Sequence, residues 1–415
     1  MVKNRRTLDL FGFFSVFVSP QPFLCFASIL GLLMTSKFSK LAKLSRKSVV
    51  LSIAMVSTVL ISAKINETSV DYEEKKRLIG LVAASLNFVF FQSFLFKFAS
   101  DDRTRQRNFL LLSTAFLFST YFWYIYKIDD GEGNYSWLKY YGVVSVSIFL
   151  SQISQISILR RSNNSILWLG SISAILFYLD DAKSASIIVF SGSLILRRFA
   201  FSNRALGSLS HLRTENSKGK FFLLMYFMGV FFLFSIIWNL GFRGFLGARV
   251  QSSLDVYGPT IFSSLFDARP ELRISLNALK SMPWYGFGTP SDAMGFALGT
   301  FAEPWNMSIV NMRMVNLRVL GEGLNVHSWF FEMLLRGGFI TIVLFIPLLM
   351  VLFRVITNPA HFSNYPGLYM VALFTMFDLF FSPFTWFSPI QVAFALIAAD
   401  FLNYQTRERH SNGNP

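Results

Sequence analysis

Cysteine and charged side chains are both scarce in this sequence. The 415 residues include one cysteine, Cys25, so the chain has no internal disulfide and a thiol or metal mechanism is not expected. Charged residues make up 15% of the chain, against about 25% in soluble domains, which argues against a globular enzyme. A phosphate-binding loop of the GxxxxGK[ST] type and a His/Cys cluster are missing as well.

Long apolar runs are abundant instead. Hydrophobic residues form 53% of the sequence, and phenylalanine occurs 49 times. Apolar runs occur at 11–34, 49–63, 78–98, 109–126, 142–159, 166–179, 184–196, 221–240, 338–353, 367–381 and 390–402. Several are shorter than the ~20 residues that a helix needs to cross a bilayer, so their ends extend into flanking polar residues. We expect an all-α polytopic membrane protein of about twelve transmembrane helices, with one large periplasmic loop that carries short helices.

Lysine and arginine are unevenly placed around these runs, which predicts the orientation of the chain. If the amino terminus lies inside and run 11–34 enters and returns near Pro20 and Pro22, the inside segments carry 23 Lys and Arg and 5 acidic residues. The outside segments then carry 15 Lys and Arg and 16 acidic residues. The net charge of +15 is thus a topology signal, and nucleic-acid binding is not expected. The alternative, a single crossing by 11–34, moves the amino terminus outside or inverts every later assignment.

Residues 166–196 predict a helical hairpin rather than one long span. A single span would bury Asp180, Asp181 and Lys183 in mid-bilayer, at about 2.5–3.5 kcal/mol each. A hairpin places all three at its tip, outside the membrane.

The pattern divides the chain into three parts. Residues 1–240 hold the amino-terminal transmembrane helices, 241–337 form the large outer loop with the candidate active site, and 338–415 hold the last spans and a cytoplasmic tail. Of four histidines only His327 falls outside, where an imidazole near neutral pH accepts a proton from a hydroxyl or binds an anion. The alternative for His327 is a solvated helix cap.

Arg269 and Arg273 stand four residues apart and share one face if they lie on a helix. Two guanidinium groups on one face suit a diphosphate, which each can grip bidentately. The alternative is a surface ion-pair cluster with Asp267 and Glu271.

Lys183 and Asp378 complete the candidate site residues. Lys183 adds positive charge from the hairpin tip, or it pairs with Asp180 or Asp181. Asp378 lies near the outer end of 367–381, where an ionisable group in a span is a functional candidate by default. The alternative for Asp378 is contact with headgroup water.

Two blocks of the sequence resemble the O-antigen ligase/polymerase family. In that family an Arg precedes an amphipathic helix and a Pro-x-x-Gly-x-Gly turn, and a His-Asn opens a helix with a Gly eleven residues after the His. The matching residues here are Arg269 or Arg273, Pro283, Gly286 and Gly288 in the first block, and His327, Ser328 and Gly338 in the second. The stretch Ala182-Lys183-Ser184-Ala185 is similar to the family's small-residue Ser-Arg element. Ser328 stands where the family has Asn, and Lys183 where it has Arg.

The resemblance implies a metal-independent, inverting membrane glycosyltransferase of the C superfamily that uses no cofactor and works at the periplasmic face of a bacterial inner membrane. Its donor is an undecaprenyl-diphosphate-linked oligosaccharide. The acceptor is a sugar hydroxyl of another lipid-linked unit, as in a polymerase, or of lipid A-core, as in a ligase. His327 then activates the hydroxyl, Asp378 positions it, and Arg269, Arg273 and Lys183 bind the diphosphate. A chain-length regulator protein is a further expected partner.

A transporter of lipid-linked oligosaccharides is the competing class. It predicts charged residues in mid-span along a path. Asp378 and Asp400 lie near span ends instead, and the cations gather in the outer loop, which favours the enzyme.

Overall fold

The structure, a computed structural model, describes residues 101–129, 137–156, 164–180, 182–205, 328–382 and 388–412, with shorter pieces within 57–65, 83–97, 228–251 and 276–288. Every long element in these segments is a helix, which confirms the all-α class for the described residues. The count of about twelve spans and the division into three parts extend beyond these residues and stay predictions.

The helices follow the apolar runs. α5 spans Asp102–Asp129, α6 spans Val143–Ile153, α7 spans Ser165–Leu179 and α8 spans Lys183–Ala205. Later in the chain, α15 spans Trp329–Ile356, α16 spans Pro366–Phe381 and α17 spans Ser388–Asn412. A π-helix, η2 (Leu138–Gly142), leads into α6, and a 3-10 helix, η5 (Pro359–Phe362), connects α15 to α16. Each of the seven α-helices contains or overlaps one predicted run.

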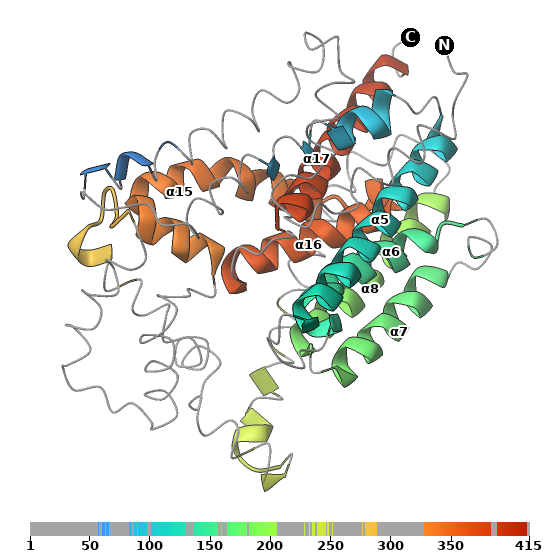
Figure 1. Ribbon diagram of the computed structural model, residues 1–415. Helices are drawn as coiled ribbons and strands as arrows, with labels where there is room; N and C mark the ends of the chain where they lie inside the picture. The colour runs from blue at the N-terminus through green and yellow to red at the C-terminus, as the bar shows by residue number, and fades with distance from the viewer. Residues whose placement is uncertain are drawn as a thin grey trace.

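α16 is the central helix of this bundle. It packs against α6, α8, α15 and α17 (Figure 1). Residues 366–372 are all buried, with Tyr369 and Val371 fully so. Gly367 lets α6 approach closely, because a Cβ there would lie 2.8 Å from the carbonyl oxygen of Ile148. Protein therefore surrounds the first half of α16.

α7 and α8 form the predicted hairpin. α7 ends at Leu179, Asp180 lies in the turn, and α8 begins at Lys183. The Ser186 hydroxyl donates to the carbonyl of Ala174 at 2.7 Å, which ties the two helices together. Gly170 faces Ser193 so closely that a larger side chain would overlap the serine. The prediction of two helices instead of one span is thus confirmed.

One end of the bundle holds the start of α16, and we call it the Tyr365 end. The Tyr365 hydroxyl donates to Asp102 Oδ1 at 2.5 Å, which joins the starts of α16 and α5. Gln152 Nε2, near the end of α6, donates to the carbonyl of Asn364 at 3.5 Å. Burial raises the pKa of Tyr365, and the hydrogen bond to Asp102 raises it further, so the hydroxyl remains a donor. Residues 101–102 and 363–365, which the charge pattern assigns to the same side, do lie together.

The opposite end, with the last turn of α16, is called the Ser382 end. Phe177 and Ala182 from the tip of the α7–α8 hairpin belong to one apolar cluster with Phe374 of α16. Trp137 packs its ring 5.6 Å from Tyr121, which brings the start of η2 to the later part of α5. Neighbouring helices therefore alternate in direction between the two ends, as a polytopic bundle requires.

α15 reverses direction at Gly338. This residue has φ 61° and ψ −157°, which is outside the helical region. Trp329 and Phe345 would be about 24 Å apart along a straight helix, yet their rings lie 5.3 Å apart. The two parts of α15 lie one above the other and meet at the bend (Figure 1). The helix thus consists of a short segment, 329–337, and a longer one, 339–356, which starts where the predicted apolar run starts.

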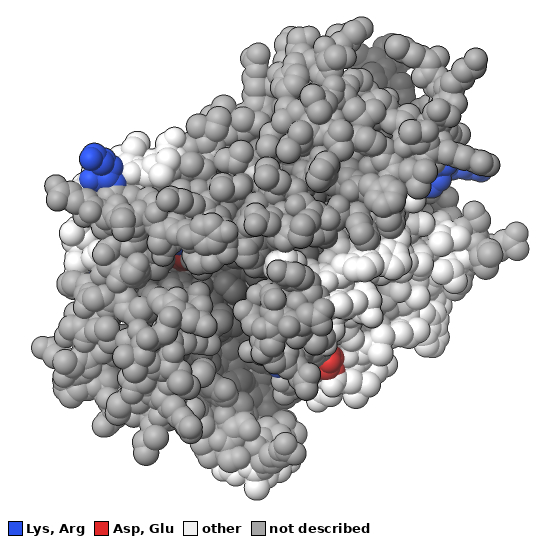
Figure 2. Space-filling model, in the orientation of Figure 1, with Lys and Arg blue, Asp and Glu red and all other residues white. Residues whose placement is uncertain are grey.

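Exposed apolar side chains follow one face of segment 339–356. The adjacent residues Phe339 and Ile340 are followed at intervals of three or four by Val343, Ile346, Met350 and Phe353. Val343, Met350 and Phe353 are each more than 60% exposed. α7 presents a similar face, on which Trp168 is 66% and Leu179 is 75% exposed. On the side shown in Figure 2, the described surface carries few charged groups. By length and composition, α5 over Asp102–Ile125 and α15 over Trp329–Ile356 could cross a membrane. Because α15 reverses at Gly338, only segment 339–356 of it could do so.

Candidate functional site

Ser328 forms the N-cap of α15, and it is the residue that follows His327 in the chain. Its backbone is extended, with φ −155° and ψ 117°, and its hydroxyl accepts a hydrogen bond from the Phe331 amide at 3.3 Å. Serine and asparagine are both strong N-cap residues, because each offers a side-chain oxygen to the free amides of the first turn. Ser328 therefore caps α15, and an asparagine at the matching position of the O-antigen ligase/polymerase family could cap a helix in the same way.

The start of α15 is attached to the end of α16. The Ser328 hydroxyl donates to the carbonyl of Leu379 at 3.3 Å, and the Trp329 amide donates to the carbonyl of Ser382 at 2.9 Å. The rings of Phe330 and Phe380 lie 5.3 Å apart beside these bonds. Ser328 is fully buried. The second block of the resemblance thus begins at the Ser382 end of the bundle.

Asp378 lies at the same junction, one helical turn before Ser382. Its Oδ1 accepts a hydrogen bond from the Ser382 hydroxyl at 2.8 Å, and its Oδ2 accepts one from Gln391 Nε2 at 2.7 Å. Gln391 is buried on α17, so the carboxylate is fixed from two elements. Each oxygen keeps a further lone pair that can accept from a hydroxyl. α16 ends at Phe381, so Asp378 lies in its last turn, as the sequence predicted.

The turn Pro283–Gly288 contacts the bend of α15 through backbone atoms. Gly286 has φ 66°, and a Cβ there would lie 2.7 Å from the Gly338 nitrogen. In return, a Cβ on Gly338 would lie 2.6 Å from the Tyr285 nitrogen. Real Cβ atoms essentially never come this close to backbone atoms. Backbone atoms of each segment therefore occupy the space that a side chain on the other segment's glycine would need.

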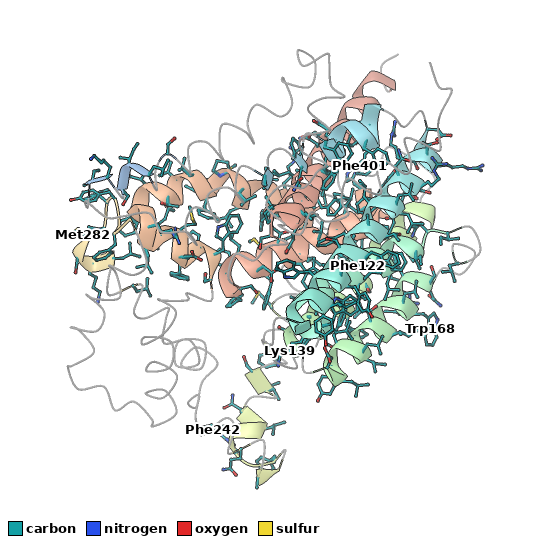
Figure 3. All side chains as sticks on the ribbon, viewed as in Figure 1. Phe122, Lys139, Trp168, Phe242, Met282 and Phe401 are labelled. Carbon is teal, nitrogen blue, oxygen red and sulfur yellow. The ribbon has the colours of Figure 1, made fainter. Side chains whose placement is uncertain are left out.

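Four hydrogen bonds reinforce this glycine contact. The amides of Phe287 and Gly288 donate to the carbonyls of Leu335 and Arg336 at 2.7 and 3.0 Å. The amides of Phe339 and Ile340 donate to the carbonyls of Pro283 and Trp284 at 2.7 and 3.4 Å. They satisfy backbone groups that the reversal at Gly338 removes from helical bonding. Figure 3 labels Met282, the residue before Pro283, beside the bend of α15.

A buried ion pair lies inside the short segment of α15. Arg336 Nη2 contacts Glu332 Oε1 at 3.0 Å, and the two side chains are 1% and 3% exposed. Removing one partner of such a pair typically costs 3–5 kcal/mol, because the other charge stays buried. Sequence reasoning missed these residues because it assigned all of 241–337 to the large outer loop. The available signal was two opposite charges four residues apart among apolar neighbours.

The third element of the resemblance lies close to α16 as well. Ala182 and Ala185 are buried in one apolar cluster with Phe374, which precedes Asp378 by four residues. Small residues at 182 and 185 allow α8 to approach α16 here. Lys183 is the first residue of α8, and its side chain lies outside the described residues.

Arg269, Arg273 and His327 also lie outside the described residues. Among the candidates that are described, the structure brings Ser328 and Asp378 to the end of α16, and it joins Gly286 to Gly338. Nine residues of helix, about 14 Å, separate Ser328 from the glycine contact.

No protein-family model matches this sequence, and no curated protein matches it. The resemblance to O-antigen ligases and polymerases therefore depends on the motif residues and on how they meet in the fold.

Proposed function

We propose that the protein is a polytopic membrane glycosyltransferase that joins lipid-linked oligosaccharides, as an O-antigen polymerase does. It resides in a bacterial inner membrane with the Ser382 end facing the periplasm. The exposed apolar faces of segment 339–356 and of α7 support a lipid environment, since large contiguous exposed apolar patches are rare on soluble monomers. The excess of Lys and Arg in the loops of the Tyr365 end supports the orientation.

The contact between Gly286 and Gly338 carries this proposal. The two glycines belong to different blocks of the resemblance and are 52 positions apart in sequence, yet a Cβ on either would overlap backbone atoms of the other's block. Composition and hydropathy would not produce such a pairing, since apolar runs alone place no requirement on a loop glycine. A shared architecture in which the Pro-x-x-Gly-x-Gly turn docks on the helix after the His accounts for it.

In the proposed reaction, the acceptor hydroxyl oxygen attacks the anomeric carbon of the donor sugar. The bond from that carbon to the diphosphate oxygen breaks, and its electron pair leaves with the polyprenyl diphosphate. Attack from the opposite face inverts the anomeric centre. His327 takes the hydroxyl proton, and Asp378, fixed by Ser382 and Gln391, orients the hydroxyl.

Charge stabilisation of the leaving group is the second requirement. Polyprenyl diphosphate leaves without protonation if cations balance its charge. We assign this role to Arg269, Arg273 and Lys183, because preorganised charge in a site that excludes water is commonly the largest catalytic contribution. An arginine grips two diphosphate oxygens at once, whereas Lys183 acts as a point charge.

Reconstitution with a synthetic donor tests the proposal. The purified chain in lipid vesicles, given an undecaprenyl-diphosphate-linked oligosaccharide, should release polyprenyl diphosphate and form products of several repeat units, with or without a chelator. Products formed only on added lipid A-core would identify a ligase. A folded protein that moves the donor across the bilayer without breaking the diphosphate bond would contradict the enzyme.

A further inference from the structure

The turn that holds Gly286 also presents an aromatic and basic surface. Trp284 is 68% exposed, although it packs its ring 6.4 Å from Phe339. Tyr285 and Lys280 are exposed beside it. The Ser62 hydroxyl donates to the Tyr285 carbonyl, which brings exposed Lys64 and Ile61 to the same place. We call Lys64, Lys280, Trp284 and Tyr285 the Trp284 surface.

The Trp284 surface directly continues the apolar face of segment 339–356. That segment has 18 residues, which is about 27 Å of helix and close to the roughly 30 Å thickness of a hydrocarbon core. Phe339, its first residue, contacts Trp284, so the apolar face ends where the aromatic and basic groups begin. Tryptophan, tyrosine and lysine at the end of an apolar helix are typical of the headgroup layer of a membrane.

We propose that the Trp284 surface anchors the protein in the lipid headgroup layer at the outer end of segment 339–356. This inference rests on the proposed function, since it requires that segment to cross a bilayer. The Trp284 ring lies among the glycerol and carbonyl groups, and Lys64 and Lys280 reach the lipid phosphates, whose charge they complement. Because Gly286 docks on Gly338 by backbone contact, the anchor fixes the height of the α15 bend in the membrane. The diphosphate of a lipid-linked donor lies in the same layer.

Because the chain has a single cysteine, replacing it allows one spin label to be placed at a chosen position and its depth in the membrane to be measured. In a Cys25→Ser background, Ser281→Cys carries a nitroxide next to the anchor and leaves Lys280 and Trp284 in place. Ser281 is exposed and accepts the label without repacking. A second label, at Met350→Cys, reports the middle of segment 339–356, where Met350 is 67% exposed. Both proteins are reconstituted in phosphatidylethanolamine and phosphatidylglycerol vesicles, and depth is read from collisions with oxygen and with a water-soluble nickel chelate.

The anchor predicts that the probe at 281 lies at the phosphate level and the probe at 350 lies deep in the hydrocarbon. Trp284→Ala should shift the probe at 281 outward by about 5 Å, the scale of interfacial burial. Trp168→Ala, which removes an equally exposed tryptophan from α7, should leave it unmoved.

The outcomes separate the anchor from the function. A probe at 281 in bulk water with a deep probe at 350 overturns the anchor and leaves the membrane protein intact. Equal shifts from Trp284→Ala and Trp168→Ala also overturn the role of Trp284. A probe at 350 in water removes the membrane proposal itself.

Discussion

An aspartate lies at each end of α16, Asp102 of α5 at one end and Asp378 of α16 at the other, and the two have different interaction partners. At the Tyr365 end, Asp102 accepts from the Tyr365 hydroxyl and lies 4.0 Å from Arg105, and its side chain is 50% exposed. At the Ser382 end, Asp378 accepts from Ser382 and Gln391, which are both neutral donors. An exposed carboxylate beside an arginine is an ordinary tether between helices. A carboxylate held in place by two neutral donors keeps free lone pairs that can accept a hydrogen bond from a substrate hydroxyl.

The largest effect should come from the histidine that precedes Ser328 in the chain. His327→Ala removes the proposed base, and we expect transfer to fall by about 10²–10⁴-fold with the protein still in the membrane. His361→Ala, in η5 at the Tyr365 end, should change the rate little. Product ladders from matched amounts of protein measure both. Normal ladders from His327→Ala would remove the assignment.

The glycine contact should give the largest effect on stability. Gly286→Ala combines an unfavourable φ with overlap of backbone atoms, and we expect a loss of about 3–5 kcal/mol or a failure to fold. Gly247→Ala is the matched control, because Gly247 has φ 99° with no atom within 4 Å of a Cβ there. It should cost only about 1–2 kcal/mol. Thermal unfolding in detergent compares the two, and equal losses would show that φ alone matters.

The aspartates themselves allow a direct comparison. Asp378→Asn keeps the shape but turns one acceptor into a donor facing Ser382 or Gln391, so the acceptor hydroxyl loses its orientation. We expect turnover to fall about 10²-fold with KM for the donor little changed. Asp102→Asn should lower the unfolding temperature and leave turnover per folded molecule unchanged. A reversed pattern would make Asp102 the functional carboxylate.

The smallest effect should come from the cap of α15. Ser328→Ala loses the hydrogen bond to the Phe331 amide and should cost about 1 kcal/mol. Ser328→Asn should retain most of that stability, because asparagine caps equally well. Unfolding midpoints measure both. If asparagine proved as damaging as alanine, the bond from Ser328 to Leu379 would matter more than the cap.

The sequence predicts best the features that depend on residues close to one another in the chain. Charge at 180–183 predicted the turn between α7 and α8, and the apolar run from 338 predicted where the long segment of α15 starts. The break after Asp378 follows from Ser382-Pro383 in the same way.

The remaining features depend on partners far away in the sequence. Tyr365 and Asp102 are 263 positions apart, and nothing in the neighbourhood of either residue indicates the other. The ion pair of Glu332 and Arg336 is buried in a segment that hydropathy alone assigns to the outer loop. The central position of α16 also depends on contacts with distant parts of the chain, since its apolar run is no more apolar than the neighbouring runs.

The contact between Gly286 and Gly338 has a consequence for the evolution of this protein. Where two side chains compete for space, shrinking one rescues an enlargement of the other. Here every close neighbour of the missing Cβ atoms is main chain, so neither position has a partner that can be trimmed. A second mutation that rescues a substitution at Gly286 or Gly338 must therefore change the length or the backbone path of the Pro283–Gly288 turn. Related proteins that lack one of the two glycines should also lack this turn.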